Sequence, residues 1–520
     1  MPSPFETIIY NRHLGFLIWQ SISSSLIFLL FKLFFLPTTS SFLATLFAFT
    51  LFLFSHLTFS FSLSLAASPA PTRPLSPLRL VLAPFSSWTL DFRRRALLSL
   101  RLGLFVAVAA VSGGVSVPCV CWVKDYDGAE LIWKLGFRGS VCGLLYGLFY
   151  VYNHKWVLKF PIVQRLPFFR FKVALCVAIG KALQFSAAAY LLSAVPVVFV
   201  ADSKKVTFGK FIAEQIMFYV GIFSVFLCWE LSHHLHRVLH TKRLIFAPPK
   251  GTAAAETNPS EPLLAALEES TSSSLLQYLA YLDLCMVCEK NVDTWRRAAF
   301  FEETSETYRR VIAVCLRPLE QLATKLGESM EAGSMDKACQ LSRQMQSPTD
   351  LHVDSKSSEP LDNFQLCAWC ARAVSSLTAH SRKEDRFGVA QLSGSNAAVI
   401  TTLLSCLLAV EAFMGKKTNL QPPHHLMGPA GIKWAALDTG RRDVGIGKKR
   451  SGQLHPKAYA MADVLKTSIY CIVSAFHDET ISSAKAGLLE KDWLAVGKPL
   501  FGTRELLLQK LQHFLDFRAS

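Results

Sequence analysis

Apolar residues dominate the first half of the chain in long runs with few interruptions. Six of these runs approach or exceed the length of about 20 helical residues that crosses the hydrocarbon core of a bilayer. They occupy residues 14–36, 41–66, 96–117, 135–152, 173–200 and 211–231. The second run contains His56 as its only strongly polar residue, whereas the shorter fourth run contains Arg138. The pattern predicts a polytopic membrane domain with about six transmembrane helices over residues 1–245.

Beyond residue 245 the apolar residues instead recur every three or four positions, which is the period of an amphipathic helix. The period is clearest in residues 275–288, 295–326, 464–476 and 504–517. Residues 246–274 are rich in small and polar residues and in proline, and they predict a flexible linker. Ser, Gly, Pro and charged residues predict mobile loops near 328–362 and 415–455. The expected fold is therefore all-α, with a helical domain over residues 275–520.

One segment of the second half approaches spanning length. Residues 397–414 are mostly apolar, but Glu411 lies within them and no tight basic cluster follows. A buried core helix is therefore favoured, because short membrane spans and core helices overlap in length and composition. The alternative is a seventh span, which would move the C-terminal tail into the lumen.

The positive charge follows the apolar half of the chain. The net charge is +16, yet residues 1–245 carry 23 Lys and Arg against 8 Asp and Glu, while residues 246–520 carry 31 against 30. Basic residues that flank apolar spans are typical of cytosolic membrane loops, whereas nucleic-acid binding needs a folded basic face. The segments after the second and fourth spans are both basic, with Arg73, Arg79, Arg93, Arg94 and Arg95 in the first and Lys155, Lys159, Arg165, Arg170 and Lys172 in the second. We therefore expect both termini in the cytosol and no direct contact with nucleic acid.

Thirteen cysteines without a repeated spacing do not form a disulfide framework. Two CxxC pairs, Cys285 with Cys288 and Cys367 with Cys370, would in principle supply four thiolates for a zinc ion. Both pairs lie in amphipathic helical patterns without the turn residues of a zinc knuckle, so core packing is favoured. No metal or other cofactor is expected.

Glu230 and four histidines lie near the end of the sixth span. His233, His234, His236 and His240 resemble the histidine-rich boxes that bind two irons in membrane hydroxylases and desaturases. Those enzymes need several boxes, and no second box occurs on a cytosolic loop between the spans. An interfacial helix end with amphipathic side chains is the favoured interpretation. A membrane di-iron oxidoreductase is the alternative function.

Lys181 and Glu214 are the two ionisable residues that would form an ion pair between the fifth and sixth spans. Ionisable residues inside spans mark substrate paths in transporters. The sequence nevertheless shows no internal repeat and no matched pair of Gly- or Pro-broken spans, as secondary transporters do. A small transporter is therefore kept only as a further alternative.

Two segments of the helical half resemble the nuclear-division-cycle (Ndc) family of transmembrane nucleoporins. The first covers residues 279–301 and the second is the sequence DRFGVAQ at 385–391. The residues that carry the resemblance are Asp283, Arg296, Arg297, Phe300, Asp385, Phe387, Gly388 and Gln391. The helix at residues 464–476 is similar to the last shared stretch of the family. These are packing motifs, so the resemblance identifies a relative and assigns structural roles, with no catalytic residue.

The resemblance implies a non-enzymatic, multi-pass protein of the pore membrane that anchors the nuclear pore complex and helps to assemble it. Such a protein supports protein and mRNA transport through the pore indirectly. The implied partners are the bilayer, an Aladin-like β-propeller nucleoporin and an inner-ring linker nucleoporin with an RNA-recognition-motif (RRM) fold. With the orientation predicted from the basic loops, both termini would face the cytosolic side of the pore.

Overall fold

The computed structural model describes residues 4–34, 42–75, 90–121, 128–161, 165–200, 208–248, 251–269, 274–342, 361–418 and 454–519. The chain divides into two compact units. The first comprises Met1–Arg243 with Ser273–Leu276, and the second comprises Leu244–Ser272 with Gln277–Ser520. Regular structure in the described residues is helical, which confirms the predicted all-α, polytopic fold.

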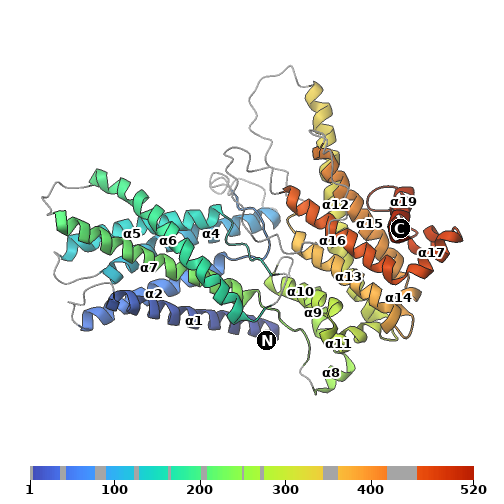
Figure 1. Cartoon of the computed structure of the whole chain (residues 1–520), viewed down its shortest axis with the longest axis horizontal. Coiled ribbons are helices and arrows are strands. Elements are labelled where there is room, and N and C mark those ends of the chain that lie inside the picture. The colour runs from blue at the N-terminus through green and yellow to red at the C-terminus, as the bar shows by residue number, and fades with distance from the viewer. Residues whose placement is uncertain are drawn as a thin grey trace. The chain divides into compact units, whose positions relative to one another are not determined.

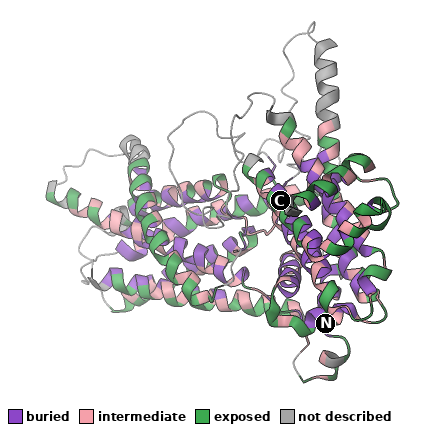
Figure 2. Ribbon diagram, turned by 45° about the vertical axis from the view of Figure 1, so that its right-hand side comes forward, coloured by how far each residue is buried: buried purple, intermediate pink, exposed green. Residues whose placement is uncertain are grey.

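The first unit consists of long helices (Figure 1). They are α1 (Pro4–Phe34), α2 (Phe42–Ala66), α4 (Leu90–Cys121), α5 (Gly128–Tyr152), α6 (Pro167–Val200) and α7 (Phe208–His240). The predicted spans fall inside these helices except at a few terminal residues, and most of the helices extend beyond them. Figure 2 shows exposed residues along these helices. Large apolar side chains are among the exposed ones, for example Trp19, Phe47, Trp133 and Leu191. An apolar outer surface of this extent fits a bilayer, since water-soluble monomers rarely expose one.

Among the described helices, six are long and apolar enough to cross a membrane. Five of them are α1, α2, α4, α6 and α7 of the first unit, and the sixth is α15 (Ser395–Thr418) of the second unit. Helix α5 does not reach this apolarity, because it carries Lys134 and Arg138 among its glycines. It packs along α4 and belongs to the same core.

Small residues bring α4 and α5 into close contact. A Cβ atom on Gly139 would collide with the carbonyl oxygen of Gly113, and one on Gly143 would collide with that of Ala109. Glycine is required at these positions because the two backbones touch, as in small-residue motifs of membrane helices. The glycines that lower the hydropathy of α5 thus fit it for close packing against α4.

The second unit contains shorter helices around a central group of four. The four are α12 (Glu306–Ser342), α13 (Phe364–Glu384), α15 and α16 (Leu454–Ala475). The smaller elements are α8 (Ala253–Thr257), α9 (Glu261–Glu269), α10 (Leu275–Glu289), α11 (Thr294–Ala298), α14 (Val389–Leu392), α17 (His477–Lys485), α18 (Leu489–Trp493) and α19 (Arg504–Ala519). Helix α15 lies against α12, α13 and α16, and Ile400, Leu403 and Leu407 are fully buried. Its surroundings in the structure are those of a core helix.

Two parts of the predicted linker and loops are helical. Within 246–274, α9 buries Leu263 and Leu264. Glu261 and Glu268 lie on the exposed side of α9 and form ion pairs with Arg310 of α12. A packed helix therefore replaces part of the expected flexible linker, because its leucines recur at helical spacing. The loop predicted near 328–362 also begins later, since α12 continues to Ser342. Residues 343–360 and 419–453, which hold the rest of the predicted loops, lie outside the described residues.

Candidate functional site

A buried ion pair joins two of the family-motif residues in the second unit. Arg296 of α11 donates to both carboxylate oxygens of Asp283 of α10, at 2.8 and 3.4 Å. The same groups bind the backbone of Phe246: its N–H donates to Asp283 (3.0 Å), and its carbonyl accepts from Arg296 (2.9 Å). Both side chains are buried, so each charge depends on the other and on these hydrogen bonds. The pair fixes the segment with which the chain enters the helical unit.

The neighbouring arginine connects α10 with the end of α13. Arg297 donates from Nε and Nη2 to the two oxygens of Glu384, at 2.8 and 2.5 Å, in the bidentate geometry that suits a guanidinium. Its Nη1 donates to the carbonyls of Cys288 in the last turn of α10 and of Lys290 just after it, at 3.2 and 3.4 Å. These carbonyls have no partner within the helix, so Arg297 caps α10 while it binds α13. Phe300, three positions later in the chain, is also buried.

The other four motif residues form a turn after α13. The carboxylate of Asp385 accepts hydrogen bonds from the N–H groups of Phe387 (3.2 Å) and Ala390 (2.8 Å). Gly388 has a φ of +67°, a left-handed conformation that side chains disfavour. Phe387 and Gln391 remain exposed on this turn. The motif therefore divides into residues that hold the fold and residues that present a surface.

The sequence did not single out the partners of these residues. Glu384, the backbone of Phe246 and the ion pair of Arg372 with Glu289 (2.5 Å) all support the same helices. Glu384 directly precedes the DRFGVAQ turn. Its position next to that motif is the local feature of the sequence by which it could have been found.

The two CxxC pairs lie inside α10 and α13, and all four thiols are buried. Burial raises the pKa of Cys367 to about 12 and raises the pKa of the other three thiols as well. Neutral thiols are poor metal ligands and poor nucleophiles. In the described part of the chain, no group of three or more His, Cys, Asp or Glu side chains is placed to hold a metal ion.

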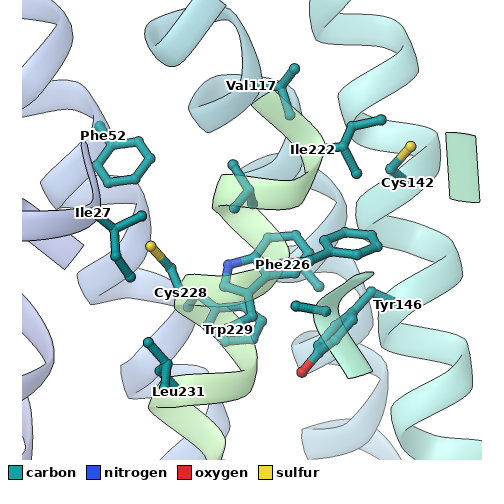
Figure 3. Close-up of a cluster of buried hydrophobic side chains, with 14 of the residues drawn as sticks. Ile27, Phe52, Val117, Cys142, Tyr146, Ile222, Phe226, Cys228, Trp229 and Leu231 are labelled. Carbon is teal, nitrogen blue, oxygen red and sulfur yellow. The ribbon is translucent and has the colours of Figure 1, made fainter. Parts of the chain in front are cut away.

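A buried aromatic cluster in the first unit includes Tyr146, Phe226 and Trp229 (Figure 3). Trp229 of α7 stacks on Phe59 of α2, with 4.7 Å between ring centroids, and packs against Tyr146 of α5. The hydroxyl of Tyr146 donates to Glu230 Oε1 (3.1 Å), and the ammonium of Lys155 donates to the same oxygen (2.6 Å). The side chain of Glu230 is fully buried and that of Lys155 is 12% exposed. This pair connects the segment after α5 to the middle of α7.

The four histidines at the end of α7 face different neighbours. His236 stacks on His240, with 4.0 Å between ring centroids, and His233 packs edge-on against Tyr150. His234 lies 4.0 Å from the buried carboxylate of Glu230. The rings thus serve the packing of helix ends, and nothing in their arrangement favours the di-iron alternative.

Lys181 and Glu214 lie on α6 and α7, and no ion pair between them occurs in the described residues. Lys181 instead interacts electrostatically with Lys155 and His234, near Glu230. The 16 residues of α7 from Glu214 to Glu230 rise about 24 Å, which separates the two members of the predicted pair. Gln215, beside Glu214, accepts a hydrogen bond from Arg138 (3.0 Å).

The fold and these sites define a multi-pass membrane protein with an attached helical domain whose conspicuous polar groups hold helices together. Residues 351–480 match the family model of the nucleoporin protein Ndc1-Nup. The chain therefore carries a domain of this nucleoporin family over residues 351–480, which confirms the predicted resemblance. The matched range includes Asp385, Phe387, Gly388 and Gln391, whereas Asp283, Arg296, Arg297 and Phe300 lie outside it. No curated protein matches the chain.

Proposed function

We propose that this protein anchors the nuclear pore complex in the pore membrane and helps to assemble it. The observation that carries the proposal is the presence, in one chain, of an Ndc1-Nup domain and a set of helices apolar enough to span a bilayer. A domain tethered to a membrane holds its partners at a high local concentration beside that membrane. The function requires no catalysis, so we assign a structural and non-enzymatic role.

The proposed arrangement has a membrane domain over residues 1–245 with both ends on the cytosolic side of the pore. The helical domain over residues 275–520 then shares a compartment with soluble nucleoporins. The family resemblance suggests an Aladin-like β-propeller nucleoporin and an RRM-containing inner-ring linker nucleoporin as its partners. In this view Asp283, Arg296, Arg297, Phe300, Asp385 and Gly388 maintain the fold.

The surface we propose for a nucleoporin partner is the turn that follows α13. Phe387 is 53% exposed and Leu392 is 85% exposed, within the part of the chain that matches the family. Asp385 and Gly388 fix the backbone between α13 and these side chains. Exposed apolar side chains on a rigid turn are suited to the buried centre of an interface.

Affinity purification of the full chain from cells, followed by mass spectrometry, tests the proposal. Inner-ring nucleoporins are expected to co-purify, and the double substitution Phe387→Ser with Leu392→Ser is expected to reduce their recovery. The matched control is Val496→Ser, since Val496 is 89% exposed but lies outside the matched range. Absence of nucleoporins from the wild-type purification would contradict the anchoring role. An unchanged recovery with the double variant would contradict only the proposed surface.

A further inference from the structure

Four polar side chains are fully buried in the part of the first unit where α1, α2 and α7 meet. They are Gln20 of α1, His56 and Ser60 of α2, and Trp229 of α7. We call these four residues the polar layer. The polar layer contains no carboxylate, ammonium or guanidinium group, so its polar interactions are hydrogen bonds between neutral groups.

Ring contacts place the α2 and α7 members of the polar layer side by side. The ring centroids of His56 and Trp229 lie 6.4 Å apart, and Trp229 also stacks on Phe59, at 4.7 Å. Ser60 follows His56 by four positions, which is about one helical turn, so the two side chains lie on the same face of α2. This face of α2 is therefore turned toward α7.

Helix α1 packs on α2 in an antiparallel arrangement. The ring of His13 lies 6.3 Å from that of Phe61, and the ring of Phe28 lies 5.0 Å from that of Phe52, measured between centroids. Gln20 lies between these two contacts on α1. The histidine and the serine of the polar layer lie between them on α2.

Helix α1 packs on α7 in the same antiparallel manner. The ring of Phe16 lies 5.1 Å from that of His236, and the ring of Phe31 lies 5.8 Å from that of Phe223. Gln20 again lies between the two contacts on α1, and the tryptophan of the polar layer lies between them on α7. The three helices therefore bring the four side chains to one level of the bundle.

Five buried atoms of the polar layer have no hydrogen-bond partner in the described part of the chain. They are Gln20 Oε1, both ring nitrogens of His56, Ser60 Oγ and Trp229 Nε1. The hydroxyl of Ser55, beside the polar layer on α2, differs from them because it bonds to the hydroxyls of Ser112 and Ser116 of α4, at 2.8 Å each. Unpaired polar atoms are strongly unfavourable inside a membrane protein, and ordered water is one of the groups that pairs with them there.

The chemistry of these atoms indicates a small, neutral ligand. The indole N–H of Trp229 only donates, the side-chain oxygen of Gln20 only accepts, and a neutral imidazole and a hydroxyl do both. A ligand that matches them must donate and accept at once, and it must fit between fully buried side chains. Water meets both requirements, and a buried water makes about three hydrogen bonds to otherwise unpaired groups. We propose that water molecules bind in the polar layer and bridge α1, α2 and α7.

X-ray hydroxyl-radical labelling of the purified full-length protein in detergent, followed by mass spectrometry, tests this site directly. Radiolysis of a bound water produces a radical that oxidises the side chains beside it, even where bulk solvent does not reach. We expect oxidation of Trp229 and His56. The matched control is Phe105, an equally buried ring that packs against the rings of Phe59 and Tyr150, and it is expected to stay unmodified. Labelling of Trp229 and His56 no stronger than that of Phe105 would overturn the proposal.

His56→Phe tests whether the ring nitrogens hold the water, because it keeps an aromatic ring and removes both nitrogens. If the nitrogens bind water, the variant loses these hydrogen bonds and its midpoint of thermal unfolding falls, which is the result we expect. If the nitrogens are unpaired, the removal of two buried polar atoms raises the midpoint. His13→Phe is the matched control, since His13 is a half-buried histidine outside the polar layer, and its midpoint is expected to stay close to that of the wild type. A raised or unchanged midpoint for His56→Phe, or an equal fall for His13→Phe, would overturn the proposal.

Discussion

At the scale of single residues, the helical unit depends on a few buried charges that contact segments distant in sequence. Arg296 binds the carbonyl of Phe246, 50 positions earlier, and Arg297 binds Glu384, 87 positions later. The motif in the sequence pointed to both arginines and to Asp283. It did not point to their partners, because periodicity within one segment carries no information about which distant segment packs against it.

Asp283→Ala is expected to destabilise the protein strongly, because it leaves the guanidinium of Arg296 buried without its carboxylate. Breaking a buried pair in this way costs about 3–5 kcal/mol of the free energy of unfolding. The measurement is urea unfolding of the full chain in detergent, followed by circular dichroism. Asp478→Ala is the control, since Asp478 is exposed and pairs with Arg382 at 3.3 Å at the surface. The control is expected to change stability by less than about 1 kcal/mol, and equal effects of the two substitutions would contradict this account.

The buried thiols give the helical unit a dependence on high pH. The pKa of Cys367 is raised from 9.0 to about 12, so the folded state keeps a proton that the unfolded state loses. The stabilisation is present below pH 9 and is lost progressively between about pH 9 and pH 12, by up to about 1.4 kcal/mol per pH unit for each thiol. Urea unfolding at pH 8 and at pH 10 checks this expectation. The free energy of unfolding of Cys367→Ala is expected to fall less between pH 8 and pH 10 than that of the wild type. An identical fall in the two proteins would contradict the role of the Cys367 thiol.

At the scale of elements, the apolar runs predicted the membrane helices because a helix in lipid must be apolar along its own length. Helix α5 contains the shortest of the six predicted runs, and its lysine, arginine and glycines suit a helix that packs on α4. The sequence predicts a linker and a loop where the structure has α9 and the end of α12. The helical pattern of α9 covers only a few residues, and the end of α12 is rich in Ser, Gly and charged residues. Packing against neighbouring helices stabilises α9 as a helix.

Gly143→Leu is expected to separate α4 from α5, because its side chain would overlap the backbone carbonyl of Ala109. We expect a lower midpoint of thermal unfolding and faster proteolysis of the detergent-solubilised protein. Gly180→Leu on α6 is the control, since no neighbouring helix lies within 4 Å of the position that its Cβ would occupy. A normal melting midpoint for Gly143→Leu would show that the two backbones do not need their close contact.

At the scale of the whole molecule, the two units of the chain differ in character. The first unit supplies apolar helices for the bilayer, and the second carries the nucleoporin domain. The sequence indicated this division because hydropathy and charge change together near residue 245. The loops that stay in the cytosol determine which side of the membrane the helical domain faces. The anchoring role requires the cytosolic side, so the orientation of this domain tests it.

The most direct measurement is immunofluorescence of the protein with an epitope after Ser520. The staining is compared between cells in which only the plasma membrane is permeabilised and cells in which all membranes are dissolved. The account predicts a continuous rim at the nuclear envelope in both conditions, because the helical domain would share the cytosolic side with the pore scaffold. Staining that appears only after all membranes are dissolved would place this domain in the lumen. Such a result, or a distribution confined to the plasma membrane or to vesicles, would contradict the account.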